Sequence, residues 1–119
     1  MSRLQGEQYE LLANNYLVTA GCKIIENNYQ ARCGEIDIIA IDEQTLIFVE
    51  VKYRSSLQFG GASSAVTKTK QKKIIKTAQY YLVTHKKYDK MECRFDVLGI
   101  DGQLNIEWLK HAFMITTNF

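Results

Sequence analysis

The segment GEIDIIAIDEQTLIFVEVKYR, residues 34–54, decides the fold of this chain. Residues 35–41 and 46–53 are rich in Ile, Val and Phe, which favour β-strands, and the polar residues 42–45 separate them. The pattern predicts a β-hairpin whose loop is either residues 43–44 or residues 42–45. In both cases opposed residues have numbers that sum to 87, so Asp37 lies across from Glu50 and Glu35 across from Lys52.

This register brings the carboxylates of Asp37 and Glu50 to one face, where opposed Cβ atoms lie about 5 Å apart and like charges repel. That face is predicted to carry Ile39, Ile41, Leu46 and Phe48, and the other face Ile36, Ile38, Ile47, Val49 and Val51. Because both faces are apolar, we expect a central hairpin with a partly covered acidic end. Burying a carboxylate costs several kcal/mol unless its charge is compensated. Lys52 supplies one positive charge against the three carboxylates of Glu35, Asp37 and Glu50, so a divalent cation would complete the charge balance.

Carboxylates beside a lysine are typical of sites that cleave phosphodiester bonds. One or two carboxylates suit Mg²⁺, which keeps several waters and completes its shell with a substrate phosphate. The metal would lower the pKa of a bound water, and Lys52 would orient the nucleophile or stabilise the phosphate charge. The alternative is a salt-bridged ladder, in which Glu35 pairs with Lys52 and Asp37 or Glu50 pairs with Arg54.

The 119 residues, 46% of them hydrophobic and 24% charged, predict one soluble globular domain over residues 1–119. No apolar run approaches about 18 residues and no export signal precedes the first helix, so we expect a cytoplasmic protein without a membrane span. Cys22, Cys33 and Cys93 have no zinc-ligand spacing and are expected to be buried thiols. The net charge of +2 makes the distribution of charge more informative than its sum.

A helix is predicted to precede the hairpin, with Ser2 and Gln5 as a capping box and an end near Gly21. Its apolar stripe contains Tyr9, Leu12, Ala13, Tyr16, Leu17 and Ala20. Glu10 borders this stripe and is a better candidate than Glu7 for a third acid facing the sheet. The alternative for Glu10 is a solvated residue that favours the helix dipole.

Residues 22–32 predict a further strand, with Asn27 and Asn28 as candidates for a bulge. Arg32 either reaches a phosphate or is an ordinary exposed turn residue. Residues 55–65 are small and polar without periodicity, so they predict a loop bordering the proposed site. Residues 93–100 and 104–110 predict two more strands, with Arg94 and Asp96 as a structural pair, and residues 111–119 a core-packing tail.

A second helix is predicted over residues 67–84, capped by Thr67 or Ser64, and it carries the strongest basic patch of the chain. Its buried stripe is Ile74, Ala78, Tyr81 and Leu82, with Ile75 at the margin. Gln71 falls within this stripe, so its amide needs a polar partner, for which we expect the charged end of the hairpin. The patch comprises Lys68 at the edge of the stripe, Lys70 near the boundary, and Lys72, Lys73 and Lys76 facing away. It either tracks a nucleic-acid backbone or is a solvated helix face.

Together these motifs resemble the YraN-like family of small bacterial proteins. The resemblance covers nearly the full chain and rests on Gly6, Glu10, Tyr16-Leu17, GEIDIIA, FVEVKYR, Lys68 to Gln71, Tyr81-Leu82 and CRFDVLGI. That family looks like a member of the restriction-endonuclease-like, PD-(D/E)xK nuclease superfamily and is similar to archaeal Holliday junction resolvases. Residue 36 is Ile where many superfamily members carry proline.

The resemblance implies an α/β fold with a mixed central sheet of about five strands flanked by helices. It implies Asp37 and Glu50 as metal ligands, Lys52 as the catalytic cation, Glu10 as an auxiliary acid among the ligands, and Gln71 as a supporting helix residue. We expect a Mg²⁺- or Mn²⁺-dependent DNA endonuclease acting on branched or repair-intermediate DNA, with a homodimer as one way to place two sites on two strands. The residues expected to bind nucleic acid are Lys68, Lys70, Lys72, Lys73, Lys76, Arg54 and Arg32. A catalytically silent DNA-binding or scaffold protein and a protein-interaction module are the alternatives.

Overall fold

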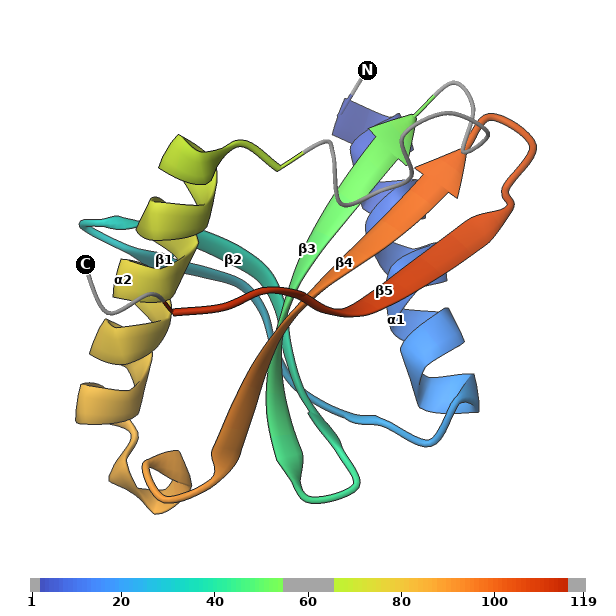
Figure 1. Cartoon of the computed structure of the whole chain (residues 1–119). Helices are drawn as coiled ribbons and strands as arrows, with labels where there is room; N and C mark the ends of the chain where they lie inside the picture. The colour runs from blue at the N-terminus through green and yellow to red at the C-terminus, as the bar shows by residue number, and fades with distance from the viewer. Residues whose placement is uncertain (1–2, 55–65, 116–119) are drawn as a thin grey trace.

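The computed structural model of the chain describes residues 3–54 and 66–115, apart from the side chains of residues 3–5. Five strands form one sheet in the order β1-β2-β3-β4-β5, with a helix on each side of it (Figure 1). The elements are α1 (Arg3–Thr19), β1 (Lys23–Ala31), β2 (Gly34–Asp42), β3 (Thr45–Arg54), α2 (Lys68–Thr84), the short 3₁₀ helix η2 (Lys86–Tyr88), β4 (Glu92–Asp101) and β5 (Ile106–Phe113). The sheet is mixed because β3 and β4 are parallel, whereas the other neighbours are antiparallel. The expected restriction-endonuclease-like α/β architecture is confirmed.

The hairpin of β2 and β3 has the predicted register, because its pairs run from Ile38 opposite Val49 to Asp42 opposite Thr45. Its loop is therefore the two-residue form, in which Glu43 has φ 58°. The ladder ends one step before Asp37 and Glu50, at the end of the sheet where α2 begins.

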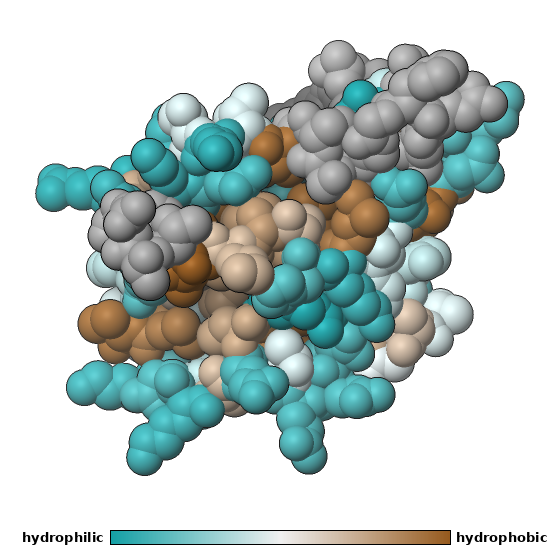
Figure 2. Space-filling model, in the orientation of Figure 1, coloured by the Kyte–Doolittle hydropathy of each residue, from teal (hydrophilic) through white to brown (hydrophobic). Residues whose placement is uncertain are grey.

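Each helix covers one face of the sheet and buries its own hydrophobic cluster. The cluster under α1 comprises Ala13, Leu17, Cys22, Ile38, Ala40, Ile47, Val49, Leu98 and Ile100. The cluster under α2 includes Ile36, Ile39, Leu46, Phe48, Ile74, Ile75, Ala78, Tyr81 and Phe95. Full burial of a large aliphatic or aromatic side chain contributes about 1.5–3 kcal/mol, so these two clusters fix both helices against the hairpin. On the α2 side, hydrophobic side chains gather between α2 and β5 and hydrophilic side chains border them below (Figure 2).

The alternation of side chains along β2 slips at Asp37. Ile36 packs in the cluster under α2, whereas Ile38 packs in the cluster under α1. Residues two apart on a regular strand share a face, so the prediction that these two isoleucines lie together is wrong. The slip coincides with an irregularity of the neighbouring strand β1. On β1, Asn27 and Tyr29 pair with Ile38 and Ile36, but Asn28 between them has φ 53°.

Two further expectations are corrected, and the predicted cap Thr67 is confirmed. The register shift of β1 falls between Ile24 and Glu26, so the bulge predicted at Asn27 and Asn28 is misplaced. The last strand begins at Ile106 and continues through Phe113, because His111 to Phe113 join β5 instead of forming a separate tail. Thr67 caps α2, since its side chain accepts a hydrogen bond from the Lys70 backbone N–H at 3.2 Å. The capping box at Ser2, the alternative cap Ser64 and the loop 55–65 lie outside the described residues.

None of the described helices is long and apolar enough to cross a membrane.

Candidate active site

Asp37 and Glu50 line one pocket at the open end of the hairpin. Its volume is about 170 Å³, and its other lining residues are Gly34, Glu35, Lys70, Lys73 and Ile74. The strands supply the acids and the first turns of α2 supply the lysines, so the pocket joins two elements that the core already fixes. The predicted face shared by Asp37 and Glu50 is therefore the wall of a cavity.

Where the hydrogen-bond ladder between β2 and β3 ends, the side chain of Asp37 accepts a hydrogen bond in place of a backbone carbonyl. Its Oδ2 accepts a hydrogen bond from the Val51 backbone N–H at 2.8 Å. Burial and the charge of Glu50 raise the pKa of Asp37 to about 7, although the Val51 N–H favours the ionised form. Asp37 is thus a carboxyl group whose charge is poorly compensated, a state that a bound cation would relieve.

Glu50 is the buried member of the pair and has two lysines as neighbours. Its side chain is 6% exposed, and its Oε1 lies 2.8 Å from the Nζ of Lys70 and 3.9 Å from that of Lys52. Burial and the neighbouring Lys70 lower the pKa of Lys52. Burial alone would also lower the pKa of Lys70, but its hydrogen bond to Glu50 and their attraction raise it. The contact between Lys70 and Glu50 was not predicted from the sequence.

Glu10 belongs to α1 and lies on the other side of Asp37 from Glu50. A second pocket, of about 140 Å³, is lined by Gly6, Tyr9, Glu10, Asp37, Val51 and Tyr53. In it, the rings of Tyr9 and Tyr53 stack with centroids 5.0 Å apart. The Nδ2 of Asn28 donates a hydrogen bond to Glu10 Oε2 at 3.1 Å. Asp37 therefore lines both pockets, while Glu50 and Glu10 line one each.

The remaining predicted residues lie around these pockets. Gln71 does not bond to the charged end of the hairpin, because its Nε2 donates to the nearby Val66 carbonyl at 3.0 Å. Lys73 lines the first pocket although the helical period places it on the outer face. Of the residues predicted to bind nucleic acid, Lys70 and Arg54 are partly buried, and the exposed ones are Lys68, Lys72, Lys73, Lys76 and Arg32.

The donor chemistry of Asp37 and Glu50 fits a hard divalent cation. Mg²⁺ accepts one or two carboxylates and keeps several waters, and Mn²⁺ accepts the same oxygen ligands. Within residues 3–54 and 66–115, however, no group of three His, Cys, Asp or Glu side chains is arranged to hold a metal ion. The structure thus brings the first two predicted ligands together and leaves Glu10 apart from Glu50.

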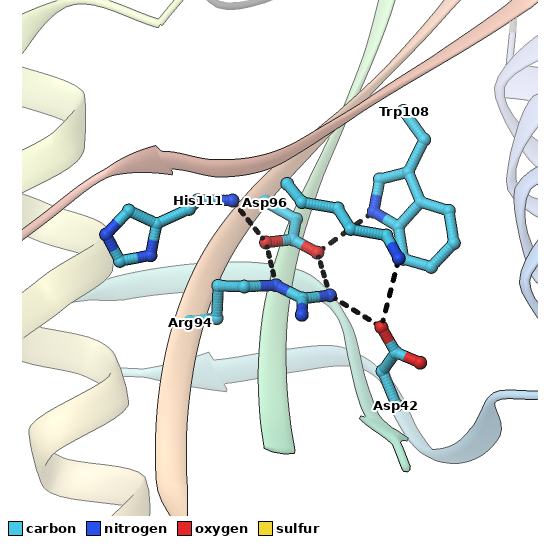
Figure 3. Close-up of polar contacts among 6 residues, drawn as sticks. Asp42, Arg94, Asp96, Trp108 and His111 are labelled. Carbon is cyan, nitrogen blue, oxygen red and sulfur yellow. Dashed lines mark hydrogen bonds and ion pairs between the residues drawn. The ribbon is translucent and has the colours of Figure 1, made fainter. Parts of the chain in front are cut away.

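A second acidic cluster lies toward the hairpin loop and is fully compensated. Asp96 is completely buried and accepts hydrogen bonds from Arg94 Nε and Nη2, Trp108 Nε1 and the His111 backbone N–H, at 2.8 to 2.9 Å (Figure 3). Arg94 also contacts Asp42 at 2.8 Å. The structural pairing predicted for Arg94 and Asp96 is confirmed, so this cluster stabilises the sheet.

The comparisons with known proteins match this chain over most of its length. The model described as "Uncharacterised protein family UPF0102" matches residues 9–100. The UPF0102 protein lpg2994 of Legionella pneumophila is 44% identical over 114 residues, which cover 95% of this chain and 97% of the relative. The UPF0102 protein YraN of Escherichia fergusonii is 41% identical, covering 91% and 82%. A solved structure of Pyrococcus furiosus SfsA in complex with Ca²⁺ is similar at a TM-score of 0.28 and 13% identity, covering 95% of this chain and 65% of that one, which is too weak to carry an argument.

Proposed function

We propose that this chain, which belongs to the UPF0102 family, is a Mg²⁺- or Mn²⁺-dependent DNA endonuclease. The observation that carries the proposal is the pair of carboxylates, Asp37 and Glu50, in one pocket with Lys52 and Lys70 beside them. Fold membership alone does not assign an activity, so the proposal rests on this site. The family is a member of the restriction-endonuclease-like nuclease superfamily.

Each residue of the site has a defined part in phosphodiester hydrolysis. Asp37 and Glu50 would hold the cation, which would supply Lewis acidity and a water of lowered pKa. Lys52 is positioned by β3 two residues after Glu50, and its ammonium would orient the nucleophile or stabilise charge on the phosphate. Burial of Glu50 excludes water from one side of the pocket, which strengthens these interactions.

Nucleic acid as the substrate is supported by the charge of α2. Its exposed lysines stand on the same helix whose first turns line the pocket. Lysines on such a face neutralise phosphates without reading sequence, which suits binding by shape, as branched or repair-intermediate DNA requires. We propose such DNA as the substrate, and a homodimer as the form that would act on two strands.

Cleavage of labelled linear, single-stranded, flap and four-way DNA in Mn²⁺ tests the proposal. We expect Asp37→Asn and Lys52→Ala to reduce cleavage by at least about 10³-fold while DNA binding stays within a few fold, because both groups act on the reacting phosphate. Glu43→Gln is the matched control, since it makes a similar change in the loop at the far end of the same hairpin. Cleavage that survives Asp37→Asn would contradict the proposal.

The second candidate is a DNA-binding protein that keeps the site without turnover. The observation that favours it is that Lys70 already compensates Glu50, and that the described residues assemble no three-ligand group. DNA binding with no cleavage of any substrate form in Mg²⁺ or Mn²⁺ would select this candidate. Loss of salt-dependent DNA binding as well would select a protein-interaction module.

A further inference from the structure

Lys70 makes the shortest ion pair at the pocket, and it comes from a different element than the acid that it contacts. Its Nζ lies 2.8 Å from Glu50 Oε1, whereas Lys52, on the same strand as Glu50, lies 3.9 Å away. The backbone of Lys70 is fixed by the Thr67 cap, and Ile74, one turn later, is buried in the core. The first turn of α2 therefore holds the ammonium of Lys70 beside the carboxylate of Glu50.

The burial of the two partners differs. The side chain of Lys70 is 43% exposed, whereas that of Glu50 is 6% exposed. Glu50 also faces Asp37, whose charge disfavours a second carboxylate in the same pocket. Removing one partner of a buried charge leaves the other uncompensated, so Glu50 depends on Lys70 more than Lys70 depends on Glu50.

We propose that Lys70 is a positioning residue that orients Glu50 in the metal-free protein and competes with a divalent cation for its Oε1 oxygen. This inference rests on the proposed function, because it concerns the same cation site. An ammonium and a divalent cation at one carboxylate oxygen repel each other. A cation bound at the site would therefore weaken the contact between Lys70 and Glu50. The released ammonium stays beside Lys73 in the pocket wall, where it can bind a substrate phosphate.

The first test is the thermal stability of the metal-free protein in EDTA. Lys70→Met is expected to lower Tm by about 5 °C, because it strands the buried charge of Glu50. Lys70→Arg should restore most of this loss, and Lys72→Met, an exposed lysine on the same helix, should leave Tm unchanged. In a Glu50→Gln background Lys70→Met should have little further effect, because the charge that needs compensation is gone.

An equal loss of Tm in both backgrounds would overturn the proposal, because it would show that Lys70 stabilises something other than Glu50. Should Lys70→Met fail to fold in EDTA, the double variant with Glu50→Gln is expected to fold again. Failure of the double variant would also overturn the proposal.

The second test is calorimetric titration with Mn²⁺. Lys70→Met should bind Mn²⁺ about tenfold more tightly than the wild type, since the competing ammonium is absent, and Lys72→Met should match the wild type. Unchanged or weaker binding by Lys70→Met, beside normal uptake by the wild type, would overturn the role of Lys70 alone. Absence of uptake by both proteins would overturn this role and the proposed cation site together.

Discussion

Asp37 and Asp96 perform the same structural task at two irregular points of the sheet. The side chain of Asp37 accepts a hydrogen bond from the Val51 backbone N–H at 2.8 Å where the β2–β3 ladder ends. The side chain of Asp96 accepts one from the His111 backbone N–H at 2.9 Å where the β4–β5 ladder is interrupted. Their surroundings differ, because Asp96 is neutralised by Arg94 whereas Asp37 faces Glu50. A poorly compensated carboxyl group in a pocket is characteristic of functional sites, and a compensated one is characteristic of structural pairs.

The raised pKa of Asp37 predicts a pH dependence of stability. Burial and the charge of Glu50 raise the pKa of Asp37 in the folded protein to about 7 from its ordinary value of 3.8, so the folded state holds more protons between these pH values. The free energy of unfolding should therefore fall as pH rises from about 4 to 7. Asp37→Asn should remove this component and raise the free energy of unfolding at pH 8 by on the order of 2 kcal/mol.

Urea denaturation in EDTA at pH 5 and pH 8 measures this effect. The control Glu43→Gln, an exposed acid in the hairpin loop, should keep the slope of the wild type. The same slope in Asp37→Asn and in the wild type would show that Asp37 ionises normally in the folded protein.

At the scale of elements, the sequence predicted the features that depend on the hydrophobic period and on the length of each apolar run. The two apolar runs of residues 35–41 and 46–53, with their short polar break, set the register that the hairpin has. The face of Ile36 was not predictable, because strict alternation assumes an unbroken ladder and the left-handed backbone of Asn28 leaves no unambiguous sequence signal. The contact of Lys70 with Glu50 was missed because a helical wheel gives the direction of a side chain, but not its reach to another element.

The pairing of β4 with β5 depends on the carboxylate of Asp96. Phe95 pairs with Phe113 and Val97 with Leu109, so four residue steps of β5 span two steps of β4, and Asp96 fills the gap. Asp96→Ala would leave the Trp108 indole N–H and the His111 backbone N–H without their acceptor and would remove one of the two carboxylates that Arg94 contacts. We therefore expect it to lower the free energy of unfolding by about 3–5 kcal/mol.

Urea denaturation at pH 7 measures this loss. Asp89→Ala, which removes an exposed acid after η2, should change the free energy of unfolding by less than about 0.5 kcal/mol. A loss of under about 1 kcal/mol for Asp96→Ala would show that the cluster contributes little to the stability of the sheet.

At the scale of the whole molecule, α1 and α2 cover opposite faces of the sheet (Figure 1), and Asp37 lines a pocket beside each helix. The pocket against α1 contains Glu10 and the stacked rings of Tyr9 and Tyr53, and the pocket against α2 contains Glu50 and Lys70. Asp37 is the residue common to both. A ligand that bridges the two helices would therefore meet the carboxylate of Asp37, one of the two acids of the proposed cation site.

Mn²⁺ titration of the wild type and Asp37→Asn by calorimetry, beside the Glu43→Gln control, measures the cation site most directly. We expect one Mn²⁺ per chain in the wild type and the control, and a loss of affinity of at least about 100-fold in Asp37→Asn, because the amide that replaces the carboxylate carries no charge. No uptake by the wild type, or uptake that Asp37→Asn leaves unchanged, would contradict a cation site at Asp37 and Glu50.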